Sequence, residues 1–229
     1  MTLPPLLIVK TGSTHPDVIR SDGDYEAWFI ASLEGGPDRT TVHPAAQKLP
    51  DPQRFGGVIL TGSPLSVRDE SPWMDRLGAW ALEAADRGVP VLAVCFGHQL
   101  VGEALGGRVG VNPAGPEYGT SEVRLTAAGR SDPLFAGLPE RIAVQQTHND
   151  ALVSAPPPER AQLLAAGESC DWQAFSAGPH LRAVQFHPEL RADTLRRLLD
   201  ARGRQGQTRP TEHGYRVLRN WDEHFVRGQ

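Results

Sequence analysis

Cysteine is scarce in this chain of 229 residues, because only Cys95 and Cys170 occur and they lie far apart. Two such residues form neither a disulfide framework nor a zinc site of the usual spacing. The sequence has no cluster of His, Cys and carboxylates at metal-ligand spacing, so we expect no metal and no cofactor. Without an export signal, we expect a cytoplasmic protein with reduced thiols. A reduced thiol is either inert packing or a nucleophile.

Long hydrophobic runs and an excess of positive charge are also missing. No apolar run reaches the about 18 residues of a membrane-spanning helix. The stretch LLIVK at 6–10 is too short and too weakly flanked for a signal peptide, and it indicates a buried strand. The formal net charge is -4, whereas nucleic acids and anionic membranes attract clustered positive charge. We therefore expect neither a nucleic-acid nor a membrane partner.

Short apolar runs alternate with helical patterns in the first half of the chain. This alternation predicts an α/β fold with three layers, in which helices flank a mostly parallel central sheet of the flavodoxin-like type. Between residues 108 and 176, short strand-like pieces separated by Gly, Pro and Asn predict a small antiparallel excursion attached to the main sheet. The main strands are expected at 6–10, 40–42, 57–61, 89–94 and 183–186, and the main helices at 24–33, 72–88, 97–105, 191–202 and 215–226.

The end of the chain differs in composition from the rest. The charges of Arg191–Arg204 indicate a solvated helix face, and the segment from Gly203 onward is rich in Gly, Gln, Arg and Pro. We therefore expect one domain at 1–204. A C-terminal extension at 205–229 should carry one helix packed on the same domain.

The most informative segment is VLAVCFGHQ at 91–99. Four apolar residues lead to Cys95, and a helical pattern with Gly97 follows directly. This order is typical of a nucleophile elbow, where a strand ends in a tight turn that exposes the nucleophile. The positive end of the following helix stabilises negative charge there. A core cysteine that closes a buried strand is the alternative, and the surrounding pattern favours the nucleophile.

A thiol nucleophile needs a base and a group that orients the base. The segment AVQFHPE at 183–189 supplies both, because an apolar strand leads to His187 at the sheet edge where Cys95 should lie. Pro188 favours an extended backbone at His187, and residues i and i+2 of an extended segment point to the same side. Glu189 should therefore contact the imidazole. The prediction is a catalytic triad of Cys95, His187 and Glu189.

Together, CFGHQ at 95–99 and FHPE at 186–189 resemble the class I (triad-type) glutamine amidotransferases. The resemblance covers about residues 6–199, and it is strongest to stand-alone members related to the amidase domain of GMP synthetase. It implies that residues 1–204 form a class I glutamine amidotransferase domain.

The resemblance also implies an oxyanion hole. In the family, the loop that follows the strand GVILT at 57–61 and the peptide after the nucleophile donate backbone N–H groups to the tetrahedral intermediate. By position, these donors are Ser63 and Phe96, with Gly62 allowing the turn. The family commonly has a second glycine where this chain has Ser63, and the donor is retained if the φ angle there stays negative.

Four further residues are implied as substrate neighbours. Gln99 lies one turn into the helix after Cys95, and Thr147, Asn149 and Asp150 belong to a segment, QTHND, that holds the α-amino and α-carboxyl groups of glutamine in the family. His98, His148 and Cys170 are interpreted as structural.

The implied reaction is that of a glutaminase. Cys95 would form a γ-glutamyl thioester and yield glutamate and ammonia for an unknown acceptor. The implied partners are L-glutamine or another γ-glutamyl compound, and a separate ammonia-accepting synthase, because no ATP-binding loop of the GxxxxGK[ST] or SGGxDS type occurs. Two alternatives stay open. One is a γ-glutamyl peptide hydrolase, and the other is a non-catalytic regulatory paralogue, against which the intact triad argues.

Overall fold

A nine-stranded sheet forms the centre of the computed structural model, which describes residues 3–228. The strand order is β2-β1-β3-β4-β11-β10-β9-β6-β7. The first five strands in this order are mutually parallel, and the pairings from β11 to β7 are antiparallel. The strands are β1 Leu6–Lys10, β2 Thr40–Pro44, β3 Gly57–Leu60, β4 Val91–Val94, β6 Glu117–Leu125, β7 Arg141–His148, β9 Gln162–Gly167, β10 Ala174–Ala177 and β11 Leu181–Val184; β5 Arg108–Val111 and β8 Asp150–Ser154 form a separate antiparallel pair.

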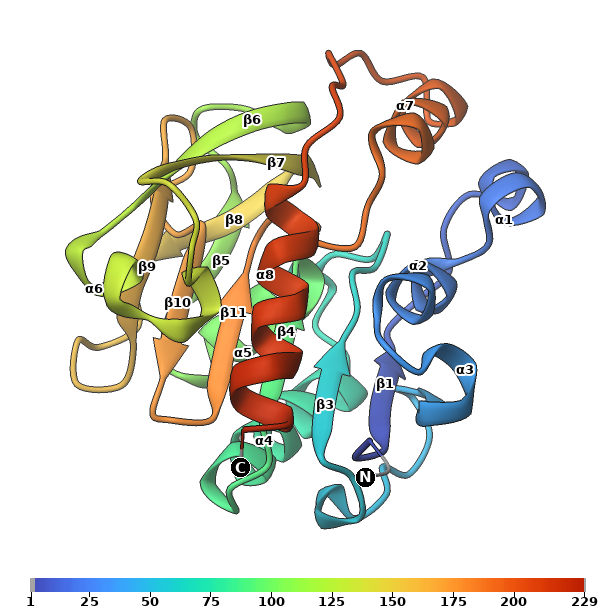
Figure 1. The fold of residues 1–229 in the computed structure, drawn as a ribbon. Helices are drawn as coiled ribbons and strands as arrows, with labels where there is room; N and C mark the ends of the chain where they lie inside the picture. Colours follow the sequence, from blue (N-terminus) through green and yellow to red (C-terminus); the bar gives the residue numbers. More distant parts are fainter. Residues whose placement is uncertain (1–2, 229) are drawn as a thin grey trace.

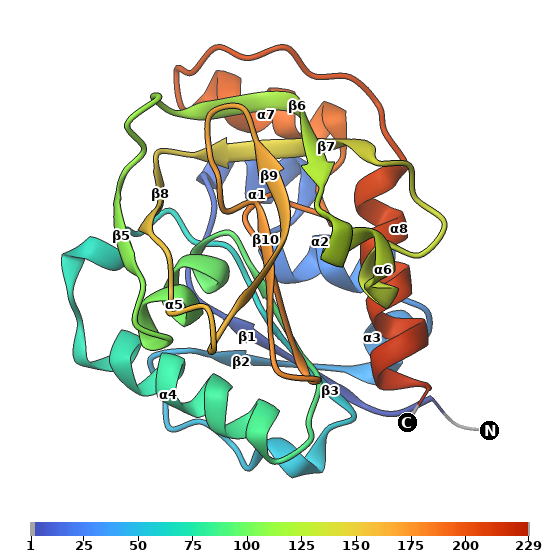
Figure 2. The ribbon, with the colours of Figure 1, turned by 90° about the vertical axis from the view of Figure 1, so that its left-hand side faces the viewer.

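Helices cover both faces of the parallel part of the sheet (Figures 1 and 2). Successive side chains of a strand point to opposite faces, so strands buried on both faces become continuous apolar runs. In β1, Leu6 and Ile8 pack in the cluster with Phe29 of α2, whereas Leu7 packs in the other cluster with Leu77 of α4. The helices are α1 Pro16–Asp22, α2 Tyr25–Ser32, α3 Gly36–Arg39, α4 Pro72–Asp86, α5 Phe96–Ala104, α6 Ala127–Ser131, α7 Ala192–Ala201 and α8 His213–Trp221.

The C-terminal helix α8 lies along the sheet face that also carries α2 (Figure 1). Its residues Val217, Leu218 and Trp221 are fully buried in the same cluster as Leu6 and Ile8 of β1. One π-helical turn, Asp222–Val226, extends it. Helix α8 and the turn that follows it are therefore part of the main core.

The observed architecture confirms the expected α/β fold with flanking helices and the antiparallel strands attached to the main sheet, while β5 and β8 form a separate small sheet. Several details differ from the expectation. The last parallel strand was expected at 183–186, but β11 spans Leu181–Val184. The helix α1 and the strand β8 were not expected at all. Within residues 3–228, no helix combines the length and the apolar character needed to cross a bilayer.

Candidate active site

Cys95 lies in a strained turn between β4 and α5. Its backbone has φ 51° and ψ -101°, a combination that non-glycine residues rarely adopt and that costs on the order of 1–3 kcal/mol. The turn is held because the Cys95 N–H donates to the carbonyl of Val184 (2.9 Å) and its carbonyl accepts from the Gln99 N–H (3.0 Å). A Cβ on Gly97 would lie 2.8 Å from Cβ of Leu60, so glycine permits the close contact of α5 with β3.

His187 and Glu189 lie just beyond the end of β11. The backbone N–H of His187 donates to the carbonyl of Gln145 on β7 (2.9 Å), which fixes the extended segment. The ring nitrogen Nδ1 of His187 is 2.7 Å from Oε1 of Glu189, and the two side chains are 2% and 0% exposed. The other ring nitrogen, Nε2, is buried and forms no hydrogen bond within the described chain.

The charges around His187 favour its protonated form. Burial alone lowers the pKa of His187, but the negative charge of Glu189 and the neighbouring Cys95 outweigh burial and raise this pKa to about 10. The carboxylate of Glu189 and the imidazole of His187 thus form a buried pair, and Cys95 is close enough to act on the charge of the imidazole. A charged imidazole beside a thiol is the setting in which a cysteine becomes a nucleophile.

The loop after β3 is fastened to the loop after β1. The hydroxyl of Thr11 donates to the carbonyl of Gly62 (2.8 Å), and the hydroxyl of Ser63 donates to the carbonyl of Thr11 (3.2 Å). Ser63 is not among the residues with positive φ, so the glycine-to-serine difference leaves its N–H in an ordinary backbone conformation. Phe96 opens α5, and the N–H groups of a helix's first turn have no intrahelical acceptor.

Gly62 is required for a different reason from the one expected. Its φ is not positive, so the turn itself does not demand glycine. A Cβ at this position would lie 2.7 Å from Cε1 of His187 and 3.5 Å from Cε1 of Tyr25. Glycine at position 62 therefore leaves room for the imidazole.

A cavity of about 170 Å³ opens onto Cys95. This volume is below the about 300–1,000 Å³ of sites for drug-sized ligands, so it suits a ligand of the size of an amino acid or a dipeptide. Gly62, His187 and Glu189 do not line the cavity, and the side chains of His187 and Glu189 are buried behind it. Seven of the ten predicted site residues line it, namely Ser63, Cys95, Phe96, Gln99, Thr147, Asn149 and Asp150.

The predicted substrate neighbours are partly occupied by contacts within the protein. Nε2 of Gln99 donates to the carbonyl of Asp150 (2.7 Å) and to Oε1 of Gln185 (3.0 Å). The carboxylate of Asp150 accepts from Nε of Arg68 (3.2 Å) and from the hydroxyl of Ser66. The Asp150–Arg68 pair therefore adds no net charge to the cavity.

Of the three residues interpreted as structural, His98 and Cys170 lie away from the cavity, whereas His148 lines it. His98 is fully buried with its ring 4.9 Å from that of Phe175, and burial lowers the pKa of His98 to about 3. Nε2 of His148 lies 2.9 Å from Oε2 of Glu117. Cys170 is 3% exposed, and burial raises its pKa to about 12.

Tyr25 and Arg202 belong to the site and were not predicted. The Tyr25 ring lies nearly parallel to that of His187, with centroids 6.4 Å apart and an interplanar angle of 18°. Nη2 of Arg202 donates to the Tyr25 hydroxyl (3.2 Å), and Arg202 lines the cavity with Cys95. Within the face 191–204 that was interpreted as solvated, Arg202 is partly exposed and faces the cavity. No local pattern marks Tyr25 or Arg202, because their contacts are with residues distant in sequence.

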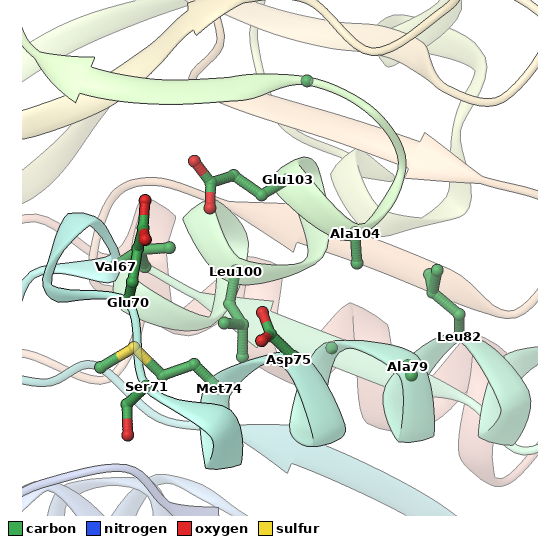
Figure 3. Close-up of a pocket in the computed structure, with 12 residues that line it drawn as sticks. Val67, Glu70, Ser71, Met74, Asp75, Ala79, Leu82, Leu100, Glu103 and Ala104 are labelled. Atoms are coloured by element: carbon green, nitrogen blue, oxygen red, sulfur yellow. The ribbon is translucent and has the colours of Figure 1, made fainter.

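A larger cavity, of about 510 Å³, lies between α4 and α5. Figure 3 shows the carboxylates of Glu70, Asp75 and Glu103 around it, with Leu100 of α5 pointing into it. None of the predicted site residues lines it. The smaller cavity is therefore the candidate active site. Among residues 3–228, no three His, Cys, Asp or Glu side chains are grouped so that they could hold a metal ion.

Comparison with known families gives a match over most of the chain. The family profile described as "Glutamine amidotransferase class-I" matches residues 36–200, well over half of the chain. The GMP synthase [glutamine-hydrolyzing] of Aeropyrum pernix is 34% identical over 182 residues, which is 80% of this chain and 29% of that protein. Gamma-glutamyl peptidase 3 of Arabidopsis thaliana is 28% identical over 153 residues, which is 66% of this chain and 61% of the peptidase.

Solved structures agree with the fold. A glutamine amidotransferase from Thermotoga maritima superposes with a TM-score of 0.72 at 19% identity, over 96% of both chains. A glutamine amido transferase from Methylobacillus flagellatus gives 0.71 at 20% identity, over 98% of this chain and 96% of that one. The chain spans less than a third of the GMP synthase it matches. On the evidence of the family match, the chain belongs to the class I glutamine amidotransferases.

Proposed function

We propose that the protein hydrolyses the side-chain amide of glutamine through a γ-glutamyl thioester on Cys95. The observation that carries this proposal is the position of Cys95, which lies in a strained elbow at the cavity and next to the buried His187–Glu189 pair. A structural cysteine would need neither the strained backbone nor the charged imidazole beside it.

In the first half of the reaction, the Cys95 thiolate attacks Cδ of glutamine. The backbone N–H groups of Ser63 and Phe96 are the proposed donors to the oxyanion, and each such donor contributes about 3–4 kcal/mol in well-studied enzymes. His187 gives its proton to the departing nitrogen as the C–N bond breaks. Ammonia leaves, and the acyl group stays on sulfur.

In the second half, water attacks the thioester carbonyl. Nε2 of His187, now neutral, takes a proton from the water, and the C–S bond then breaks to release glutamate. Glu189 holds the imidazole through Nδ1 (2.7 Å) and stabilises its charged form. The thiolate–imidazolium pair is restored, so the cycle consumes one water and needs no cofactor.

The use of the ammonia is part of the proposal. The GMP synthase of Aeropyrum pernix carries the words "glutamine-hydrolyzing" in its name, and this chain corresponds to 29% of it. We infer that an ammonia-accepting synthase uses the ammonia in the cytoplasm.

A second candidate is hydrolysis of γ-glutamyl peptides, which uses the same thioester. The match with this chain covers 60% of gamma-glutamyl peptidase 2 and 61% of gamma-glutamyl peptidase 3 of Arabidopsis thaliana. The cavity also contains Arg202, which has no acidic partner among the described residues. A leaving group with a carboxylate could use this charge, whereas ammonia could not.

Glutamate release from glutamine by the purified chain tests the proposal, with Cys95→Ala as the matched control. We expect release by the native protein, loss in the variant, and a mass increase of one γ-glutamyl group on Cys95 in a rapidly quenched sample. If a folded sample forms no thioester with glutamine or with a γ-glutamyl dipeptide, the non-catalytic alternative is correct. A higher kcat/KM for the dipeptide than for glutamine would favour the peptidase.

A further inference from the structure

Two arginines line the cavity at Cys95, and they differ in their partners. Arg68 forms an ion pair with Asp150 (3.2 Å), so its charge is compensated. Arg202 is half-buried and forms no salt bridge with any described residue, whereas its neighbours Arg191 and Arg197 on the same segment are paired with Asp193 and Asp22. Arg202 is therefore an arginine of the cavity lining that has no acidic partner among the described residues.

The position of Arg202 is fixed by the fold. Arg202 caps the end of α7 through its N–H, which donates to the carbonyl of Leu198 (3.1 Å), and Gly203 with φ 62° turns the chain away. The following segment is bonded to β6, because the N–H of Thr120 donates to the carbonyl of Gln207 (2.8 Å). Arg202 is thus held at the cavity by structure on both sides of it.

Arg202 is connected to the base of the proposed reaction through one side chain. Its Nη2 donates to the hydroxyl of Tyr25, and the Tyr25 ring is parallel to that of His187. Asp24 fixes Tyr25, since its carboxylate caps α2 by accepting from the Tyr25 N–H (2.9 Å). Because His187 protonates the departing nitrogen, groups attached to that nitrogen must lie close to His187 and within reach of its neighbours.

We propose that Arg202 is a binding site for a carboxylate on the leaving group, so that the site also accepts γ-glutamyl amino acids and short γ-glutamyl peptides and prefers those with a free carboxylate next to the scissile bond. The inference rests on the thioester chemistry proposed above. A guanidinium presents paired N–H donors that match a carboxylate. A half-buried guanidinium without another partner is stabilised most by such a hydrogen-bonded carboxylate. Free glutamine releases ammonia and leaves this site unused.

The test compares two substrates that differ only in the carboxylate, γ-glutamylglycine and γ-glutamylglycinamide. The native protein should favour the acid over the amide in kcat/KM. In Arg202→Gln, the loss for the acid should exceed the loss for the amide by about 10- to 100-fold, the value of a charged hydrogen bond. Arg202→Lys, which keeps the charge without the paired donors, should restore part of the preference.

Arg204→Gln is the matched control. Arg204 lies two residues further on the same segment, stacks over the Tyr118 ring at 5.7 Å and does not line the cavity. This variant should keep the native preference for the acid. If Arg202→Gln lowers kcat/KM equally for the acid, the amide and glutamine, Arg202 binds the glutamyl portion that all three share, and the inference is overturned. An unchanged kcat/KM for all three would overturn it as well.

Calorimetric binding to Cys95→Ala separates this inference from the proposed reaction, because it needs no turnover. Tighter binding of γ-glutamylglycine than of its amide, lost when Arg202→Gln is added, supports the carboxylate site even if the native protein proves inactive. Turnover of glutamine by the native protein with equal binding of the two dipeptides leaves the reaction standing and refutes the site.

Discussion

The contact between Gly62 and His187 allows a quantitative test of the site. A Cβ at position 62 would lie 2.7 Å from Cε1 of His187, whereas carbon atoms rest at about 3.5–4.0 Å. In Gly62→Ala, the imidazole must therefore shift by about 1 Å. It cannot do so freely, because Glu189 is bonded to Nδ1 on one side and the Tyr25 ring lies parallel to it.

A displacement of this size at a catalytic group costs on the order of 100-fold in rate. We therefore expect kcat for glutamate release from Gly62→Ala to fall by about two orders of magnitude, and the free energy of unfolding to fall by about 1–3 kcal/mol, as for other overpacked sites. Urea unfolding measures the second quantity. A loss of kcat much larger than the loss of stability is the specific expectation.

Gly57→Ala is the matched control at the other end of the same chain segment. A Cβ there would lie 2.8 Å from Cγ2 of Val226 and 3.0 Å from the Trp221 ring. This overlap is similar to that in Gly62→Ala but lies far from Cys95. The free energy of unfolding should therefore fall by a similar amount in both variants, while kcat of Gly57→Ala changes by less than about threefold.

A second measurement separates displacement of His187 from disturbance of the oxyanion loop. Alkylation of Cys95 by iodoacetamide depends on the thiolate, which the imidazolium stabilises, and not on oxyanion donors. In Gly62→Ala, alkylation at neutral pH should slow together with glutamate release. If both rates stay within about threefold of those of Gly57→Ala, the argument from the Gly62–His187 contact is refuted.

Three further predictions follow from single contacts. Glu189→Gln should lower kcat by up to about 10⁴-fold, because the imidazole loses the group that orients it and stabilises its charge; a change below about tenfold in glutamate release would contradict this role. At about pH 8, iodoacetamide should label Cys95 and leave Cys170 intact, since burial raises the pKa of Cys170 to about 12 and keeps it a protonated thiol. Peptide mass mapping shows which cysteine is labelled, and Cys170→Ser should keep the native kcat. Asp222→Ala should lower the free energy of unfolding by about 3–5 kcal/mol in a urea titration, because the buried Arg39 would lose its paired carboxylate and stay charged. The side chain of Arg39 is 3% exposed. A loss below about 1 kcal/mol would show that water reaches the guanidinium.

The parts of the fold that could be predicted from the sequence have strong local signals. Continuous apolar runs that end at Gly or Cys marked β1, β3 and β4, because strands buried on both faces contain few polar residues. Helix α4 has a clear apolar stripe with Pro72 in its first turn. The strained elbow was predictable for the same reason, since a buried strand and a helical pattern meet at Cys95.

The elements that were missed have weak local signals. Helix α1, Pro16–Asp22, buries only Val18, and one residue cannot show a period. Strand β8, Asp150–Ser154, begins with a charged residue and follows β7 after only Asn149. Asp150 can start a strand because Arg68 and Ser66 satisfy its carboxylate.

Tyr25 and Arg202 show a different limit. Their hydrogen bond joins residues 177 positions apart, and each lies in a segment whose pattern is that of an ordinary surface helix. Whether an arginine is solvated, paired or presented to a ligand depends on which acidic side chains the fold brings near it. Arg68 and Arg202 line one cavity with opposite outcomes, and the sequence around each gives no indication of which is which.

The strand order explains why the predicted site is assembled at all. In β3-β4-β11, the strand that ends at Cys95 lies between the strand that leads to Gly62 and the strand that leads to His187. All three are parallel, with Leu60 beside Ala93 and Val94 beside Val184, so their carboxyl ends lie at one edge of the sheet. Ligand sites of such sheets form at this edge. An order that did not keep β4 between β3 and β11 would place a strand between the thiol and either Gly62 or His187, about 4.8 Å further away, which is beyond the reach of a hydrogen bond. The predicted triad therefore depends on this topology, and the short spacing of HPE accounts only for the His187–Glu189 contact.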